Sequence, residues 1–410
     1  MPGRRPLLLV AVLACLTGAI TACGKDERLG QGSSNAPRPA VGQTGESGGG
    51  GGGGDEESDA PPFSVFATKN TTRVGGSDPV ANAAAIAQAT YPGARPRAVT
   101  LVDTGSWQDG VAAAVLMSAP VRAPILLTDD GDVPQPTGDA LDALDPRGSA
   151  RLRGAQVVRV GDAAEPDGLR AIKPGGDSVF ETAQRIDRLS TTARGKPSES
   201  VVVAPADRPA FAVPAAGWAA KSGDSVLWVR RDEVPAATRA ALTSHQQPDI
   251  YLLGPESAVS AATEDELRKL GTVTRIEGPN PVANAIAFAR YRKGRFGWGV
   301  VDPGHGLVFA SQRRPLDAVA AAPLSATGSY GPLLLIDDGD RLPGLDEAYL
   351  LDIQPGYERD AVRGVYNHGW LIGDEQAISQ RVQARIDELL QIVPVREAPP
   401  AAGAGQRDTN

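Results

Sequence analysis

The sequence predicts an α/β fold made of three tandem βαβ-type repeats with parallel sheets. Between residues 63 and 395 the same order of features occurs three times, with a period of about 100 residues. Short β-branched runs alternate with Ala-rich segments of helical length, a pattern typical of parallel strands joined by crossover helices. Hydrophobic residues make up 41% of the chain and charged residues 22%. This balance excludes a globally disordered protein.

Each repeat opens with a glycine-containing turn that leads into an Ala-rich helix. The residues expected to cap these helices are Asp78, Asp177 and Asn280, because a short polar side chain there accepts hydrogen bonds from free backbone N–H groups. Pro79 and Pro281 stand at the first helical position, where the missing N–H of proline costs nothing. The three helices are predicted at residues 79–89, 179–189 and 281–291.

The rest of each repeat is predicted to contain a buried strand, a second Ala-rich helix and two further apolar strands. The first strands are expected at residues 98–103, 200–204 and 296–302, and the second helices at 107–118, 209–221 and 315–326. The second strands are expected at residues 123–127, 225–229 and 331–336. The closing strands, each ending in glycine and followed by a further helix, are expected at residues 157–161, 250–254 and 370–373. Small helical side chains allow close approach to the sheets, and the sequence leaves open whether the three sheets are separate or merged.

The N-terminal residues are typical of a lipoprotein signal peptide. Two arginines and a short apolar run at residues 7–16 precede the sequence Ile20-Thr21-Ala22-Cys23. The apolar run is shorter than the about 20 residues that a membrane-spanning helix needs. We therefore expect residues 1–22 to be cleaved, and Cys23 to carry a diacylglycerol and an acyl chain such as palmitate. A rival motif before Cys15 would leave too short an apolar run, and in an ordinary secretory signal Cys23 would be incidental.

A flexible linker is expected after the lipid anchor. Residues 23–62 are rich in Gly, Ser, Pro and acidic residues, with an unbroken glycine run from Gly48 to Gly54, and cannot bury enough apolar surface to fold. A coil of this length has an r.m.s. span on the order of 35 Å. Residues 396–410 form a similar disordered tail. The predicted location is the extracytoplasmic face of the cell membrane, with the folded part able to reach the envelope.

Cysteine usage and charge restrict the partners of the folded part. Cys15 and Cys23 both lie before the repeats, so the repeats can form neither a disulfide nor a thiolate metal site. The formal net charge of -8 argues against nucleic-acid binding, which needs a basic face. We expect the repeats at residues 63–170, 171–272 and 273–395.

In these features the sequence resembles the bacterial cell-wall-binding repeat of the second type, found in tandem threes on surface proteins of Gram-positive bacteria. The resemblance covers about residues 64–390 and rests on the Arg-apolar-Gly-Gly turn at residues 73–76, on Asp109 and Asp317 near the start of the second helix, and on strands that end in glycine. The middle repeat has Ala210-Phe211-Ala212 where the others have the acid. The resemblance implies a pseudo-trimer of three units that attaches non-covalently to anionic wall polymers or peptidoglycan in grooves between units.

Few residues suggest catalysis, a metal or a cofactor. His245, His305 and His368 are far apart in the sequence and none has a partner at metal-ligand spacing, so we expect no metal site and no cofactor. Asp109 and Asp317 could be catalytic carboxylates, but the helix dipole also favours an acid in the first turn of a helix. We adopt the dipole interpretation and predict no enzymatic activity.

The third repeat contains the candidate ligand-binding residues. Its segment 297–306 is denser in Gly, Trp and His than the other loops, although an irregular strand connection could have the same composition. Arginine clusters lie on either side of this segment, and guanidinium groups bind phosphate bidentately. The candidates are Arg290, Arg292, Arg295, Trp298, His305, Arg313 and Arg314.

The predicted function is that of a membrane-anchored lipoprotein that binds the cell wall non-covalently, through an anionic wall polymer or peptidoglycan. A second hypothesis is a solute-binding or sensory lipoprotein with a ligand cleft between α/β units, where doubly wound sheets often bind ligands. A third is a degenerate hydrolase. A small ligand retained through purification would favour the second hypothesis. Turnover abolished by Asp109→Asn or Asp317→Asn would favour the third.

Overall fold

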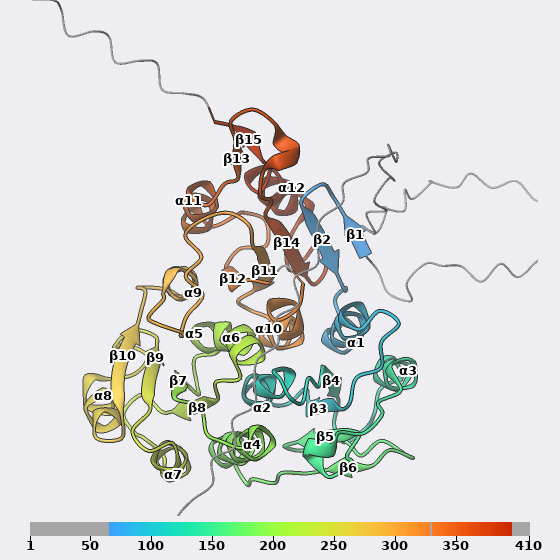
Figure 1. The fold of residues 1–410 in the computed structure, drawn as a ribbon, viewed down its shortest axis with the longest axis vertical. Coiled ribbons are helices and arrows are strands. Elements are labelled where there is room, and N and C mark those ends of the chain that lie inside the picture. Colours follow the sequence, from blue (N-terminus) through green and yellow to red (C-terminus); the bar gives the residue numbers. More distant parts are fainter. Residues whose placement is uncertain (1–64, 329, 396–410) are drawn as a thin grey trace, which may run out of the picture. The chain divides into compact units, whose positions relative to one another are not determined.

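The computed structural model describes residues 65–328 and 330–395 (Figure 1). The expected signal peptide at residues 1–22, the lipid-bearing Cys23, the linker at residues 23–62 and the tail at residues 396–410 lie outside the described residues. The chain divides into the units Met1–Gly53 and Gly54–Asn410, and every described residue belongs to the second unit. In this described part, no helix is both long and apolar enough to cross a bilayer.

The first of three separate large sheets is all parallel and has the strand order β4-β3-β5-β6. Its strands are β3 (Val99–Asp103), β4 (Ile125–Thr128), β5 (Val157–Val160) and β6 (Ala171–Ile172). The helices of this repeat are α1 (Pro79–Thr90), α2 (Trp107–Ala113), the 3-10 turn η1 (Ala114–Met117), α3 (Gln135–Leu144) and the 3-10 turn η2 (Ala150–Leu152). Every residue of β4 is buried, as expected for a parallel strand covered on both faces.

The second sheet has the order β10-β9-β7-β8, again all parallel. Its strands are β7 (Ser200–Pro205), β8 (Val226–Val229), β9 (Asp249–Leu253) and β10 (Thr272–Ile276). The helices are α4 (Val179–Arg194), α5 (Pro209–Ala212), α6 (Pro214–Ser222), α7 (Ala236–Ser244) and α8 (Ala261–Arg268).

The third sheet has the order β1-β2-β14-β11-β12, in which only the β1–β2 pair is antiparallel. Its strands are β1 (Val65–Ala67), β2 (Thr71–Val74), β11 (Gly306–Ser311), β12 (Leu333–Ile336) and β14 (His368–Ile372). The helices are α9 (Pro281–Arg290), α10 (Pro315–Ala320), η3 (Ala322–Ser325), α11 (Gly344–Asp352), η4 (Ala361–Arg363) and α12 (Gln380–Leu389). A small parallel pair joins β13 (Gly356–Tyr357) to β15 (Val393–Pro394).

Each large sheet is completed by a strand that belongs, in sequence, to the start of the next repeat. Strand β6 pairs with β5 just before α4, and β10 pairs with β9 just before α9. The circle closes because β2, which precedes α1, pairs with β14 of the last repeat. The three repeats therefore form a closed pseudo-trimer. The repeat ranges 63–170, 171–272 and 273–395 stay a prediction, since the sheets take strands across those boundaries.

Small residues let the second helices of the repeats meet where the three repeats come together. Helices α2, α6 and α10 contact one another (Figure 1). A Cβ on Gly110 of α2 would lie 2.5 Å from the side chain of Val319 in α10, and one on Gly217 of α6 would lie 2.6 Å from Ser325 in η3. Apolar residues from all three repeats form one continuous buried core around these helices. Small side chains therefore serve helix–helix contacts as well as the expected contacts with the sheets.

The first-helix caps follow the sequence prediction in two repeats out of three. Asp78 accepts hydrogen bonds from the N–H groups of Val80 and Ala81, and Asn280 accepts one from Ala283 at 2.9 Å. In the middle repeat the cap is Ser178 and not the predicted Asp177, because Ser178 is the extended residue directly before α4 and its hydroxyl accepts from the Glu181 N–H.

One predicted strand is wrong. Residues 296–302 form an irregular segment, and the strand expected there begins only at Gly306. Gly297 and Gly299 have φ of 94° and 62°, a left-handed conformation that no strand adopts. The helix expected after the first closing strand is also absent, since residues 161–170 contain only turns. Helices α3, α7 and α11, which connect the second and closing strands, were not predicted.

Candidate functional site

The junction between the third and first repeats is a buried polar network built on a glycine turn. Gly75 has φ of 95°, and a Cβ there would collide with the side chain of Asn82. The Asn82 Oδ1 accepts a hydrogen bond from the Gly76 N–H at 2.6 Å, and its Nδ2 donates to the Gly76 carbonyl at 3.1 Å and to Asp317 Oδ1 at 2.9 Å. Asn82 therefore holds the turn of one repeat and binds the second helix of another.

Two charged residues complete this junction. Asp317 is 1% exposed, and burial raises the pKa of its carboxyl despite the Asn82 hydrogen bond and the nearby Arg314. The Arg314 guanidinium lies 3.6 Å from Asp317 and 2.9 Å from Asp374, and donates to the Ser77 carbonyl at 2.8 Å. Both side chains are thus engaged in joining the repeats.

The junction between the first and second repeats has the acid but a different partner. Asp109 lies in the first turn of α2, where Ser106 caps the helix by accepting from the Asp109 N–H. It is 6% exposed, and burial raises the pKa of its carboxyl to about 6. A Cβ on Gly161, whose φ is 60°, would collide with this carboxylate, so the glycine that ends β5 makes room for it. Thr182 stands where Asn82 stands in the first repeat, six residues after the second turn glycine.

The junction between the second and third repeats has lost the acid. Phe211 occupies the third position of α5, where α2 and α10 carry Asp109 and Asp317. Asn284 stands where Asn82 stands in the first repeat. It is 0% exposed, and neither its Oδ1 nor its Nδ2 has a hydrogen-bond partner. Arg275 in β10 donates to the carbonyls of Gly254 at 2.8 Å and Val259 at 3.0 Å. Arg73 in β2 makes the equivalent contacts with the carbonyls of Gly373 at 2.8 Å and Ile378 at 2.6 Å, so this contact is common to this junction and the one between the third and first repeats.

A groove lies between the first and second repeats, at the carboxyl ends of β7 and β8. It encloses about 720 Å³ and is lined by Gln108 from α2, Phe180 from α4 and the loop 230–233. The Gln108 Nε2 donates to the Ala206 carbonyl at 3.0 Å, and the Arg230 guanidinium lies 4.5 Å from the Phe180 ring centroid. Parallel sheets present ligand sites at strand carboxyl ends, so this groove is the candidate site between units.

The groove carries mixed charge. Arg230 pairs with Glu233 at 2.8 Å and Arg231 pairs with Asp232 at 2.8 Å. Exposed pairs of this kind contribute little to stability, and a ligand can compete for both guanidinium groups. Sequence reasoning did not select these arginines. The sequence feature that could have identified them is their position directly after β8, because the carboxyl end of this buried strand borders the groove.

The predicted ligand residues of the third repeat differ in their surroundings. Arg292, Arg295 and Arg313 are exposed, whereas Arg314 is held in the junction described above. Arg290 pairs with Asp352 and lies 4.9 Å from the Tyr349 ring centroid.

Trp298 and His305 are less accessible than these arginines. Trp298 is 8% exposed and packs edge-on against Trp218 with ring centroids 5.3 Å apart, so it lies in the core. His305 is half-buried, with its Nε2 3.3 Å from Asp302 Oδ1.

The structure does not bring all seven candidates together. His305 precedes β11 and Arg313 follows it. A six-residue strand spans about 20 Å, so these two side chains lie at opposite ends of the sheet. Asp109 and Asp317 do not line the groove. In residues 65–328 and 330–395, no group of three His, Cys, Asp or Glu side chains is arranged to hold a metal ion.

Comparisons with known proteins agree with this architecture. Residues 73–164 and 275–383 match the family model of cell wall binding domain 2. Cwp6 from Clostridium difficile has a similar structure, with a TM-score of 0.63 at 18% identity over 78% of this chain and 48% of that one. Cwp8 from the same organism gives a TM-score of 0.61 at 19% identity over 79% of this chain and 52% of that one.

A curated relative matches a shorter stretch. The amidase enhancer of Bacillus subtilis (strain 168) is 28% identical over 171 residues, which are 42% of this chain and 22% of that protein. The chain thus spans about half the length of the two similar structures and less than a quarter of the enhancer. At these identities, the two structures show a shared fold.

Proposed function

This chain belongs to the cell wall binding domain 2 family through residues 73–164 and 275–383, and from this premise we propose that it binds the bacterial cell wall non-covalently, without catalysing a reaction. The observation that carries the proposal is the closed ring of three α/β repeats, in which the first and third repeats match the family. The ring places a groove at a repeat junction, where a polymer chain can lie across two units.

The proposed ligand is an anionic wall polymer or peptidoglycan. The net charge of -8 opposes attraction through bulk charge, so recognition relies on local arginines. Arg230 and Arg231 line the groove, and Arg292, Arg295 and Arg313 are exposed on the third repeat. Planar guanidinium groups bind phosphate and carboxylate with two hydrogen bonds each. Arg290, Arg314, Trp298 and His305 are proposed to support this binding surface indirectly, because each contacts another side chain of the protein.

Lipid attachment at Cys23 is the second part of the proposal. It rests on the basic, apolar and small-residue pattern of residues 1–22. Two or more acyl chains anchor a protein stably where one chain is marginal. Fractionation of cells that produce the chain with Cys23→Ser tests this part. The variant should leave the membrane fraction, and retention there would contradict lipid anchoring at this residue.

Wall binding is tested by co-sedimentation of the Cys23→Ser chain with isolated cell-wall sacculi, before and after their anionic polymers are stripped. Binding that stripping abolishes identifies an anionic polymer, and binding that survives identifies peptidoglycan. No sedimentation with either refutes wall binding. Replacing Arg292, Arg295 and Arg313 with Ser should weaken sedimentation more than a matched triple change at the exposed Arg185, Arg188 and Arg381.

A solute-binding or sensory lipoprotein is the second candidate function. The groove of about 720 Å³ at strand carboxyl ends is the observation that favours it, because pockets of this size hold small molecules. A stoichiometric small ligand that stays bound through purification would support this candidate. A degenerate hydrolase would instead show turnover that Asp109→Asn or Asp317→Asn abolishes.

A further inference from the structure

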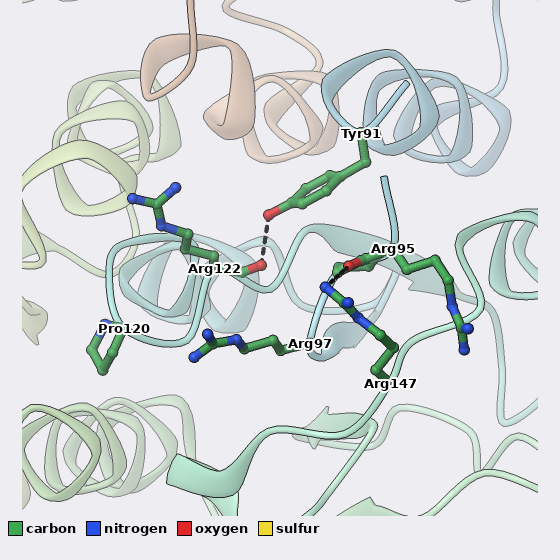
Figure 2. A pocket seen from close by; sticks show the side chains of 7 residues that line it. Tyr91, Arg95, Arg97, Pro120, Arg122 and Arg147 are labelled. Atoms are coloured by element: carbon green, nitrogen blue, oxygen red, sulfur yellow. Dashed lines mark hydrogen bonds between the residues drawn. The ribbon is translucent and has the colours of Figure 1, made fainter. Parts of the chain in front are cut away.

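The first repeat has a pocket at the edge of its own sheet where the amino ends of β3 and β4 lie. It encloses about 390 Å³, and its lining includes Arg95, Arg97, Arg122 and Arg147 together with Tyr91 and Pro120. These arginines come from three separate loops, which precede β3, precede β4 and follow α3. Arg95 and Arg97 flank Pro96 in one loop, and the fold brings this loop together with Arg122 and Arg147 (Figure 2).

Backbone contacts hold the three loops in place. The Tyr91 hydroxyl donates to the carbonyl oxygen of Arg122 at 2.6 Å. The Arg147 N–H donates to the Pro96 carbonyl at 3.1 Å, and the Arg147 Nη2 donates to the Arg95 carbonyl at 3.2 Å. Figure 2 shows the first and last of these bonds. The loops are therefore tied through carbonyl groups, which leaves most of the guanidinium nitrogens available.

The pocket has more positive charge than its surroundings neutralise. Arg95 pairs with Asp145 at 2.7 Å. In residues 65–328 and 330–395, the guanidinium groups of Arg97 and Arg122 have neither an ion pair nor a hydrogen bond, and that of Arg147 has only a carbonyl partner. Figure 2 shows the Arg97 and Arg122 guanidinium groups extending toward the same side of the pocket. Like charges gathered in a concave surface attract an anion.

The other repeats fill the same edge with different contacts, although Arg194 donates to the Gly223 carbonyl in the second repeat and Arg292 and Arg295 lie between α9 and β11 in the third. In the second repeat, a buried His245 lies 2.9 Å from Asp187, which also accepts from the Ser225 hydroxyl at 2.6 Å. In the third repeat, Asn367 accepts from the N–H groups of Gly304 at 2.8 Å and His305 at 3.1 Å. The polar contacts at this edge therefore differ from one repeat to the next.

We propose that this pocket, defined by Arg97, Arg122 and Arg147, binds a phosphate group of a wall polymer. Guanidinium groups from separate loops can approach a tetrahedral phosphate from different directions, each with two donors. Tyr91 and Pro120 offer apolar surface for the adjoining carbon skeleton. The polymer as the source of the phosphate rests on the proposed wall binding, whereas the phosphate site itself stands on the pocket alone.

Calorimetric titration of the Cys23→Ser chain with poly(glycerol phosphate) tests the proposal, with inorganic phosphate as a second probe and uncharged dextran as a control. Loss of two charge-assisted contacts in the R97S/R122S double variant should weaken polymer binding by roughly tenfold or more. The matched variant R185S/R188S changes the net charge equally on the exposed face of α4 and should bind as the parent does. Because the guanidinium groups of Arg97 and Arg122 make no hydrogen bond or ion pair within the described residues, R97S/R122S should keep the parent's unfolding temperature.

Equal binding by R97S/R122S and R185S/R188S would overturn the pocket assignment. Sedimentation with sacculi would be unaffected by that result, so failure of the pocket and failure of wall binding are distinguishable. Vesicles of phosphatidylglycerol separate the two sources of a phosphodiester. If R97S/R122S lowers binding to vesicles but not to the polymer, the site recognises lipid and the polymer assignment is wrong.

Discussion

Replacing Asp346 with Thr should stabilise the protein and change how its stability depends on pH. Asp346 is 0% exposed, and neither of its carboxyl oxygens has a hydrogen-bond partner. The equivalent residues of the other repeats are Thr137 and Thr238, whose hydroxyls each donate at 2.5 Å to a strand carbonyl ten residues earlier. Asp346 stands at the same spacing after Ile336, the last residue of β12. Thr at this position can form the bond that the sister repeats form.

The magnitude follows from proton uptake on folding. Burial raises the pKa of Asp346 well above its usual range, and the neighbouring Asp337 raises it further. An unfolded aspartate ionises with a pKa near 3.9, so between that pH and the folded pKa the native state holds one more proton than the unfolded state. Stability therefore falls by about 1.4 kcal/mol for each unit of rising pH in this window. The penalty accumulates as pH rises and stops growing above the folded pKa.

Chemical unfolding followed by tryptophan fluorescence at pH 5, 6, 7 and 8 measures this effect. Asp346→Thr should exceed the parent in unfolding free energy at pH 7, by about 1.4 kcal/mol for each pH unit of the window in which the parent takes up a proton on folding. The difference should shrink toward pH 5. The reciprocal change Thr238→Asp is the matched control and should introduce the same pH dependence in the second repeat. A difference between Asp346→Thr and the parent that is constant across pH would refute the reasoning.

Three further perturbations test the junctions and the core by the same unfolding assay. Asn284→Leu should stabilise the protein by about 1 to 3 kcal/mol, because it removes two buried polar groups without partners. Asn82→Leu should destabilise it, because the Asn82 amide oxygen and nitrogen are both hydrogen-bonded. Equal effects of the two variants would contradict this difference in hydrogen bonding. Gly110→Ala should destabilise the protein by about 1 to 3 kcal/mol, because its Cβ would lie 2.5 Å from a side chain of α10. An increase in stability would contradict this expected steric overlap between α2 and α10. Burial lowers the pKa of His245, but Asp187 and the Ser198 carbonyl outweigh burial and raise it. The His245–Asp187 pair therefore stabilises the protein fully below a pH of about 6.5 and less as pH rises through the folded pKa. The stability advantage of the parent over Asp187→Asn should shrink over that range, and a growing advantage would refute the pairing.

Local chemistry was sufficient to predict most strands and the first helices of the repeats. Asp78 and Asn280 cap their helices as expected, because capping depends only on the next few residues. The β-branched runs became buried parallel strands, since apolar runs bounded by turns depend on local composition. The threefold order of features therefore predicted the α/β class and the three repeats, while it left open whether the three sheets are separate or merged. The strand predicted at residues 296–302 was wrong, because glycines in this segment adopt positive φ and the strand begins only at Gly306.

The sequence by itself determined the class of fold, the count of repeats and the family resemblance, while only the tertiary structure decided how the repeats join and which polar groups meet. Exchange of β2 into the sheet of the last repeat pairs residues about 300 positions apart, which no local pattern encodes. For the same reason Arg97, Arg122 and Arg147 form one pocket although they come from three separate loops. Trp298, which the sequence analysis selected as a candidate ligand residue, lies in the core. Periodicity and capping act over a few residues, whereas a binding surface depends on which distant segments the closed ring brings together.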